Sequence, residues 1–192
     1  MAAAVHRNLA LFGPAGSGKG TQAELLRRKL GLEHIATGEM LRQEHSKGTE
    51  LGQTLATYLD QGKLVPDEVI VAMIRHRLDD PSADSGFVLD GFPRTLTQAR
   101  ALEEMLARVG RPLDMVLVLK VPTEQLVQRL ELRARQQNRA DDTRDVIEER
   151  LRIYREQTAA ALDYLAESVP LFHVDGTRPA EAVFQAILGA VS

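Results

Sequence analysis

The sequence predicts an α/β fold, a doubly wound, five-stranded parallel sheet with helices on both faces. Three observations support it: five short apolar runs are bounded by Gly, Pro or Asp, helical periodicity fills the gaps between them, and a glycine-rich loop follows the first run. Short, continuously apolar runs are typical of buried parallel strands, because helices cover both faces of such a sheet. The expected strands span residues 8–12, 33–36, 87–89, 115–121 and 170–174.

Apolar residues at helical spacing predict the segments between the strands. Helices are expected over 22–29, 51–59, 69–78, 102–109, 146–166 and 179–191. Pro66 opens the third of these, with Asp67 and Glu68 in its first turn, where negative charge stabilises a helix. Thr97 is the expected cap of the fourth.

Two segments depart from this alternation. Residues 38–80 are expected to form helices without a strand, and residues 129–150 are rich in charge and poor in apolar residues. We expect one domain with a core of residues 1–36, 66–128 and 151–192, an insertion at 37–65 and a lid at 129–150. Because ligands of open α/β sheets bind beyond the carboxyl ends of the strands, excursions from that edge can close over a ligand.

Composition excludes several classes of protein. The net charge of -3 over 192 residues argues against a nucleic-acid-binding surface. The chain has no cysteine, which excludes disulfides and thiolate zinc sites and fits a reducing cytoplasm. No apolar run approaches membrane-spanning length, and the start is too short for a signal peptide. A cytoplasmic protein without membrane partners is expected, and a monomer, because no unmatched apolar stripe is visible.

The stretch Gly13-Pro14-Ala15-Gly16-Ser17-Gly18-Lys19-Gly20-Thr21 lies between the first strand and the first helix. This order turns a glycine pattern into a phosphate-binding P-loop, because backbone N–H groups and the helix N-terminus point at the anion. Lys19 is expected to reach the β- and γ-phosphates. The usual hydroxyl residue after the lysine is replaced by Gly20, and Thr21 follows it. The alternative, a glycine-rich turn without a ligand, is disfavoured by the lysine and the hydroxyl.

Asp90 ends the third apolar run, where a carboxylate is well placed to hold Mg²⁺ or its waters and to compensate for the missing hydroxyl. The alternative for Asp90 is a cap of a helix or turn. Arg94 follows Pro93 and suits a phosphate clamp, because a guanidinium binds phosphate oxygens bidentately. Taken by itself, Arg94 would more often be a solvated surface charge.

Three further residues are weaker candidates for the site. Thr37 can cap the next helix and face the site, and Arg42 lies within reach of a second phosphate. Gln98 carries an amide that can donate to and accept from a base edge. In isolation, Thr37 with Gly38 would be an ordinary turn from a strand to a helix, and Gln98 would be a solvent-facing helix residue. His34 and His173 lie in apolar runs and are expected in the core.

A basic stretch near residue 140 completes the candidates: Arg129, Arg133, Arg135, Arg139, Arg144 and Arg150. A charge run is often only a salt-bridged, solvated helix. We favour a lid here, because a P-loop needs positive charge over the transferring phosphoryl group.

Together these motifs resemble the adenylate kinase family over nearly the whole chain. The matching segments are 13–21, 37–42, 62–67, 90–95 with Gln98, the lid residues Arg129, Arg133, Arg139, Asp141, Asp142 and Arg150, and 175–178. The resemblance implies a P-loop NTPase-type sheet with a helical monophosphate-binding insertion and a short lid. The insertion and cysteines of long-lid members are missing, so no zinc is expected. The lid tip Gln136-Gln137-Asn138-Arg139 departs from the family's Gly-Arg pair.

The resemblance also implies an activity and its residues: ATP + AMP ⇌ 2 ADP, with Mg²⁺ held near Asp90 through water, in adenine nucleotide homeostasis. The catalytic residues it implies are Lys19, Arg94, Arg133, Arg139 and Arg150. The implied ATP contacts are Gly16, Ser17, Gly18, Lys19, Gly20, Thr21, Arg129, Arg133 and Arg178. The implied AMP contacts are Thr37, Arg42, Lys63, Leu64, Val65, Gly91, Phe92, Pro93, Arg94, Gln98, Arg139 and Arg150.

Two other functions stay open on the sequence. A UMP/CMP kinase would share the fold, but such relatives usually place Asn where this chain has Thr95. A P-loop nucleotide switch or ATPase belongs to a different class. The chain has no Asn-Lys-x-Asp guanine reader, and a pure binding module would not need so many arginines at one site.

Overall fold

A computed structural model of the protein describes residues 7–137 and 143–192, with side chains over 7–136 and 143–192. Its parallel sheet has the strand order β2-β3-β1-β4-β5. The strands are β1 (Asn8–Phe12), β2 (Glu33–Ala36), β3 (Phe87–Asp90), β4 (Met115–Lys120) and β5 (Leu171–Asp175). The predicted fold class is confirmed, and each strand lies within a residue or so of its expected bounds.

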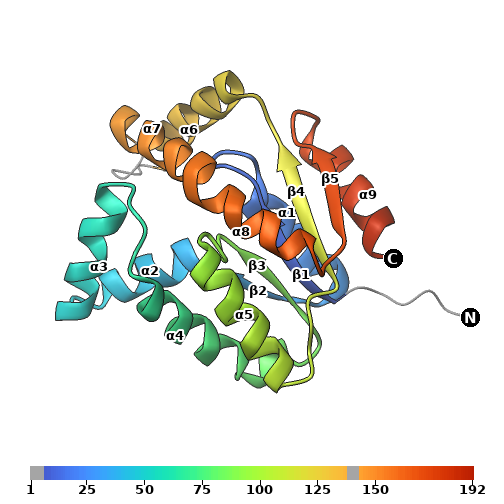
Figure 1. Ribbon diagram of the computed structural model, residues 1–192. Coiled ribbons are helices and arrows are strands. Elements are labelled where there is room, and N and C mark those ends of the chain that lie inside the picture. The colour runs from blue at the N-terminus through green and yellow to red at the C-terminus, as the bar shows by residue number, and fades with distance from the viewer. Residues whose placement is uncertain (1–6, 138–142) are drawn as a thin grey trace, which may run out of the picture.

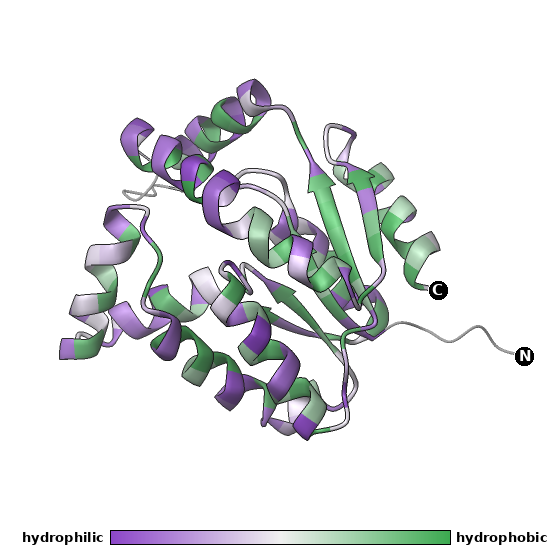
Figure 2. Cartoon of the chain, viewed as in Figure 1, coloured by the Kyte–Doolittle hydropathy of each residue, from purple (hydrophilic) through white to green (hydrophobic). Residues whose placement is uncertain are grey.

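Helices cover both faces of the sheet (Figure 1). One face packs on α1 (Lys19–Leu30) and α9 (Ala180–Val191), and the other on α4 (Asp67–Leu78), α5 (Leu96–Arg108) and α8 (Ala159–Ala166). Successive residues of β1 alternate between the two apolar clusters: Leu9 and Leu11 join one, and Ala10 and Phe12 the other. Figure 2 shows the strands as largely hydrophobic. Each fully buried Leu or Phe stabilises the fold by about 1.5–3 kcal/mol.

The two excursions are helical. Between β2 and β3 run α2 (Thr37–Ser46), α3 (Glu50–Asp60), α4 and the short 3₁₀ helix η1 (Pro81–Ala83), and no strand occurs in residues 37–86, all of which the structure describes. Beyond β4, α6 (Thr123–Gln137) and α7 (Arg144–Ile153) share a small apolar cluster of Leu126, Leu130, Ile147 and Leu151. Figure 1 shows α3 and the pair α6/α7 at the same end of the molecule.

Three local expectations needed correction. The single helix expected at 146–166 is α7, a π-helical turn η2 (Tyr154–Thr158) and α8. Helix α1 begins at Lys19, since Gly18 in the phosphate loop is its N-cap. Helix α5 is capped by Thr95 and not by Thr97: Thr95 is extended and its hydroxyl accepts from the backbone N–H of Gln98 at 3.1 Å, whereas Thr97 lies inside the helix.

None of the helices within residues 7–137 and 143–192 combines the length and the apolar character that a bilayer-spanning segment requires.

Candidate active site

A cleft opens at the carboxyl edge of the sheet. Strands β1 and β3 are parallel neighbours, with Leu11 opposite Asp90, so the loops that follow them leave the sheet side by side. These loops, the insertion and α6/α7 line a cleft of about 820 Å³. Its position beyond the strand ends is the usual one for ligand sites of open α/β sheets.

The phosphate loop curls tightly between β1 and α1. Gly13 has a φ of +146°, and a Cβ placed there would lie 2.6 Å from Ser17 Oγ and 2.9 Å from the carbonyl oxygen of Leu119, so only glycine fits. Ser17 Oγ is buried and has no hydrogen-bond partner within the described residues. A buried, unsatisfied hydroxyl beside a helix N-terminus fits an anionic ligand.

Lys19 lies at the first position of α1 and reaches back over the loop. Its ammonium donates to the carbonyl oxygens of Gly13 at 2.6 Å and Pro14 at 3.0 Å. Burial lowers the pKa of Lys19 to about 8; the Asp90 carboxylate opposes this shift, while Arg94 and Arg133 add to it. A ligand that supplies negative charge beside this buried ammonium would therefore raise the pKa of Lys19 again.

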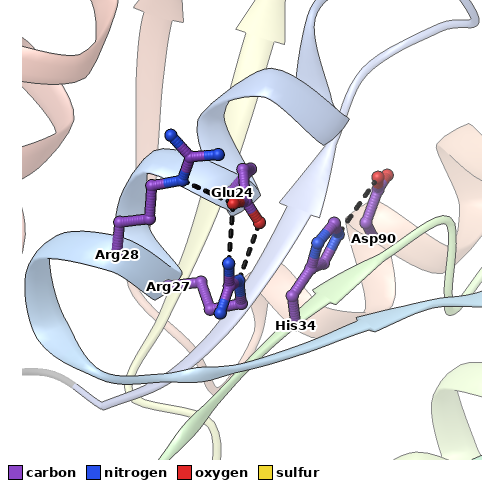
Figure 3. A network of polar contacts seen from close by, with 5 residues as sticks. All are labelled: Glu24, Arg27, Arg28, His34 and Asp90. Atoms are coloured by element: carbon purple, nitrogen blue, oxygen red, sulfur yellow. Dashed lines mark hydrogen bonds and ion pairs between the residues drawn. The ribbon is translucent and has the colours of Figure 1, made fainter.

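Asp90 faces this lysine from the end of β3, with its carboxylate 17% exposed and 3.6 Å from His34 Nε2 (Figure 3). Burial raises the pKa of Asp90, but His34, Lys19 and Arg94 outweigh it, so the net shift is downward and the carboxylate stays ionised. A Cβ at Gly20 would lie only 3.3 Å from Asp90 Oδ2. The carboxylate therefore occupies the space beside the position where other P-loops carry a hydroxyl.

Arg94 lies in the loop after β3 and is held by its own backbone neighbours. Its Nε donates to the carbonyl oxygen of Gly91 at 2.8 Å, and Thr37 Oγ1 donates to the same oxygen at 3.0 Å. Burial lowers the pKa of Arg94, Asp90 opposes the shift and Arg150 adds to it. These contacts fix the guanidinium in the wall of the cleft.

The lid arginines come from α6 and α7. Arg129 Nη1 donates to the carbonyl oxygen of Gly176 at 2.9 Å, which ties α6 to the loop after β5. Arg150 Nη2 lies 3.4 Å from the carbonyl oxygen of Leu59 at the end of α3. Arg133 also lines the cleft. Arg139 lies outside the described residues, as do Asp141 and Asp142.

The structure brings most of the expected site residues to the wall of this one cleft: Gly16, Ser17, Gly18, Lys19, Gly20, Thr21, Thr37, Arg42, Lys63, Leu64, Val65, Asp90, Gly91, Pro93, Arg94, Gln98, Arg129, Arg133, Arg150 and Arg178. Phe92 differs from them. It is 1% exposed, packs in the apolar cluster beneath the site and does not line the cleft. An aromatic ring in the loop just after a buried strand gains more from the core than from a polar cleft.

Several cleft residues were not anticipated from the sequence. Gln22 in α1 lines the cleft, as do Ile153, Tyr154 and Thr158 around the π-helical turn, a feature frequent at functional sites. No periodicity distinguishes such a turn from an ordinary helix. His173 was expected in the core but is exposed on the edge strand β5, whereas His34 is half-buried against Asp90.

Within the described residues no three His, Cys, Asp or Glu side chains are grouped to hold a metal ion. A single carboxylate beside a phosphate loop fits Mg²⁺, which keeps most of its waters and takes further ligands from nucleotide phosphates.

The fold and the site define a class: a P-loop phosphotransferase that acts on nucleotides. The family model described as "Adenylate kinase" matches residues 11–169. A protein of Stenotrophomonas maltophilia (strain K279a) named "Adenylate kinase" is 46% identical over 183 residues, 95% of this chain and 98% of the relative. One of Thermobifida fusca (strain YX) with the same name is 47% identical over 181 residues, 94% and 96% of the two chains. The chain belongs to the adenylate kinase family. It is an enzyme with adenylate kinase function, and the UMP/CMP kinase and switch alternatives are not favoured.

Proposed function

We propose that the cleft binds ATP with its phosphates on residues 13–21 and AMP between the insertion and Arg94, and that it catalyses ATP + AMP ⇌ 2 ADP. In the forward direction an oxygen of the AMP phosphate attacks the γ-phosphorus of ATP. The bond from that phosphorus to the β–γ bridging oxygen breaks. ATP thereby becomes one ADP, and AMP becomes the other. This reaction needs positioning and charge neutralisation more than a covalent residue.

One observation carries the proposal: Lys19 begins the helix after the loop that follows β1, and Arg94 lies in the loop after the adjacent parallel strand β3, which ends at Asp90. The Asp90 carboxylate acts on the pKa of both cations. Two phosphate-binding cations near one carboxylate in the same cleft suit a donor phosphate chain and an acceptor phosphate that meet in line.

Asp90 would hold Mg²⁺ through its waters, and the ion would neutralise charge on the ATP phosphates. The 3.3 Å approach of Asp90 Oδ2 to a Cβ built at Gly20 supports this role, since the carboxylate lies where the missing hydroxyl would meet the ion. Gly20 leaves the room that a water between carboxylate and metal requires.

The arginines would divide between the two nucleotides. Arg129 and Arg178 would lie against ATP, Arg42 and Arg94 would hold the AMP phosphate, and Arg133, Arg139 and Arg150 would surround the transferring group. Electrostatic stabilisation by such groups is worth about 3–4 kcal/mol each in a water-excluded site. Closure of the lid would also exclude water, which is the competing acceptor. A cytoplasmic location, a monomeric state and a role in adenine nucleotide homeostasis stay predictions.

The test measures ADP formation from Mg-ATP with AMP, CMP, UMP or water as acceptor. AMP should be strongly preferred, and Arg94→Ala should lower kcat/KM for AMP by about 10²–10³. Arg108→Ala, an exposed arginine at the end of α5, is the matched control and should leave the rate unchanged. Preference for CMP or UMP would overturn the AMP assignment, and equal rates with water would overturn the kinase reaction.

A further inference from the structure

Asp67, at the first position of α4, is half-buried and does not line the cleft, yet it contacts a residue that does. Its Oδ1 accepts from Gln98 Nε2 at 2.7 Å, and its Oδ2 accepts from Thr95 Oγ1 at 2.9 Å. At the other end of the amide, Gln98 Oε1 accepts from the backbone N–H of Arg94 at 2.8 Å. The Gln98 side chain is therefore held at both ends by the protein.

These two partners fix which way the amide points. An ionised carboxylate can only accept a hydrogen bond and a backbone N–H can only donate one. With the amide reversed, Gln98 Oε1 would face the Asp67 carboxylate, and Nε2 would face the Arg94 N–H. Both contacts would then be repulsive, and two buried polar groups would lose their partners.

An amide held in this way keeps one donor and one acceptor for a ligand, since Nε2 carries a second hydrogen and Oε1 a second lone pair. Adenine offers a 6-amino donor beside the N1 acceptor. Hypoxanthine and guanine offer the opposite pair, a 6-oxo acceptor beside an N1–H donor. For a purine that presents position 6 to Oε1 and N1 to Nε2, the fixed amide matches adenine, and a 6-oxopurine in the same pose would need the reversed amide.

We propose that Asp67 is a positioning residue that sets the base specificity of the acceptor site, by holding Gln98 in the orientation that accepts AMP and rejects 6-oxopurine monophosphates. The inference rests on the proposed placement of AMP against Gln98. Asp67 acts through Gln98 and touches neither nucleotide.

The test compares AMP with inosine monophosphate, which differs only in carrying the 6-oxo group and the N1 hydrogen. In Asp67→Asn the new amide can donate to Oε1 of a reversed Gln98, so one of the two contacts that oppose reversal is relieved and only the Arg94 N–H still opposes it. We expect KM for AMP to rise about tenfold with kcat within a factor of two, and the AMP-to-inosine-monophosphate ratio of kcat/KM to fall at least tenfold. Glu68→Gln removes the same charge from the next, exposed position and should leave the ratio unchanged.

A merely structural role would lower kcat/KM for both acceptors alike, or raise KM for ATP as well, and either result overturns the proposal. If Asp67→Asn does not fold, Asp67→Ser replaces it, because a hydroxyl can also donate or accept. Gln98→Leu tests the placement of AMP against Gln98 separately from the role of Asp67. If Gln98→Leu leaves base selectivity intact, the proposed AMP placement fails; if it abolishes selectivity and Asp67→Asn does not change it, only the role of Asp67 fails.

Discussion

The ammonium of Lys19 donates to the carbonyl oxygen of Gly13 at 2.6 Å, so the lysine closes the phosphate loop on itself. Burial lowers the pKa of this lysine to about 8, since the ammonium has lost most of its water and the nearby Asp90 restores only part of the stabilisation. Phosphate oxygens would bring negative charge to the same place. Nucleotide binding is thereby coupled to the protonation of Lys19.

The first prediction concerns pH. A bound triphosphate favours the ammonium form and raises the pKa of Lys19, so between pH 8 and the raised value Mg-ATP binding takes up a proton. Affinity should be constant below pH 8 and fall as pH rises, by up to about tenfold per pH unit. Calorimetry in two buffers of different ionisation enthalpy measures the uptake directly. In Lys19→Arg, whose guanidinium stays charged, the dependence should vanish; binding by the unmodified protein without proton uptake at pH 9 would contradict the coupling.

The second prediction concerns Asp90 and Mg²⁺. Asp90→Asn should raise the Mg²⁺ concentration for half-maximal activity about tenfold, because a neutral amide orients metal-bound waters less strongly than a carboxylate. It should also lower the pKa of Lys19 further, since the Asp90 charge is what raises it. The pH above which Mg-ATP affinity declines should therefore move down. Asp163→Asn, an exposed carboxylate on α8, should change neither value. An unchanged Mg²⁺ requirement in Asp90→Asn would remove the carboxylate from the metal site.

The parts of the site that the sequence predicted are local ones. The phosphate loop is a continuous stretch, Asp90 ends a strand and Arg94 lies four residues beyond it, so spacing alone brings them to the sheet edge. The bond from Gln98 to Asp67 spans 31 residues and joins the first turns of two helices. Only the packing of α4 beside α5 creates it. From the sequence, Asp67 was expected in the first turn of a helix. A negative charge stabilises a helix there by itself, so it does not indicate a distant partner.

Gln22 is a stronger case of a contact that the sequence does not reveal. Its Nε2 donates to the carbonyl oxygen of Ala180 at 3.0 Å across 158 residues, and this bond ties the helix after the phosphate loop to the start of α9. Gln22 is 2% exposed, and its Oε1 has no partner among the described residues. Arg178, an expected ATP contact, lies two residues before Ala180.

The third prediction follows from this bond. Gln22→Leu should raise KM for Mg-ATP about fivefold to tenfold, because the loop before α9 loses a hydrogen bond worth about 1 kcal/mol that fixes it beside the ATP site. KM for AMP should stay unchanged, as the bond lies on the far side of the cleft from the insertion. Steady-state kinetics with each substrate varied in turn measure both values. Gln185→Leu removes an exposed amide from α9 and should be silent. Equal effects on both substrates would mean that Gln22 only stabilises the fold.

The insertion contacts α7, the helix that carries Arg150, through the turn at Gly62. Gly62, in the turn after α3, has a φ of +68°, and a Cβ there would lie 3.0 Å from both Cγ1 and the carbonyl oxygen of Val146 in α7. Close by, Arg150 of α7 reaches the carbonyl oxygen of Leu59 at 3.4 Å. The turn that leads to Lys63, Leu64 and Val65 therefore rests on the helix that carries Arg150.

The fourth prediction separates this contact from the backbone requirement. Gly48 has nearly the same φ, +69°, but no atom within 4 Å of its would-be Cβ. Gly48→Ala should lower the free energy of unfolding by about 1–2 kcal/mol, the cost of a left-handed non-glycine residue. Gly62→Ala should cost about 1–3 kcal/mol more, because its methyl group also pushes the turn away from α7. Only Gly62→Ala should raise KM for AMP. Urea denaturation and AMP kinetics on both variants measure these differences, and equal values would show that α7 does not support the AMP side of the cleft.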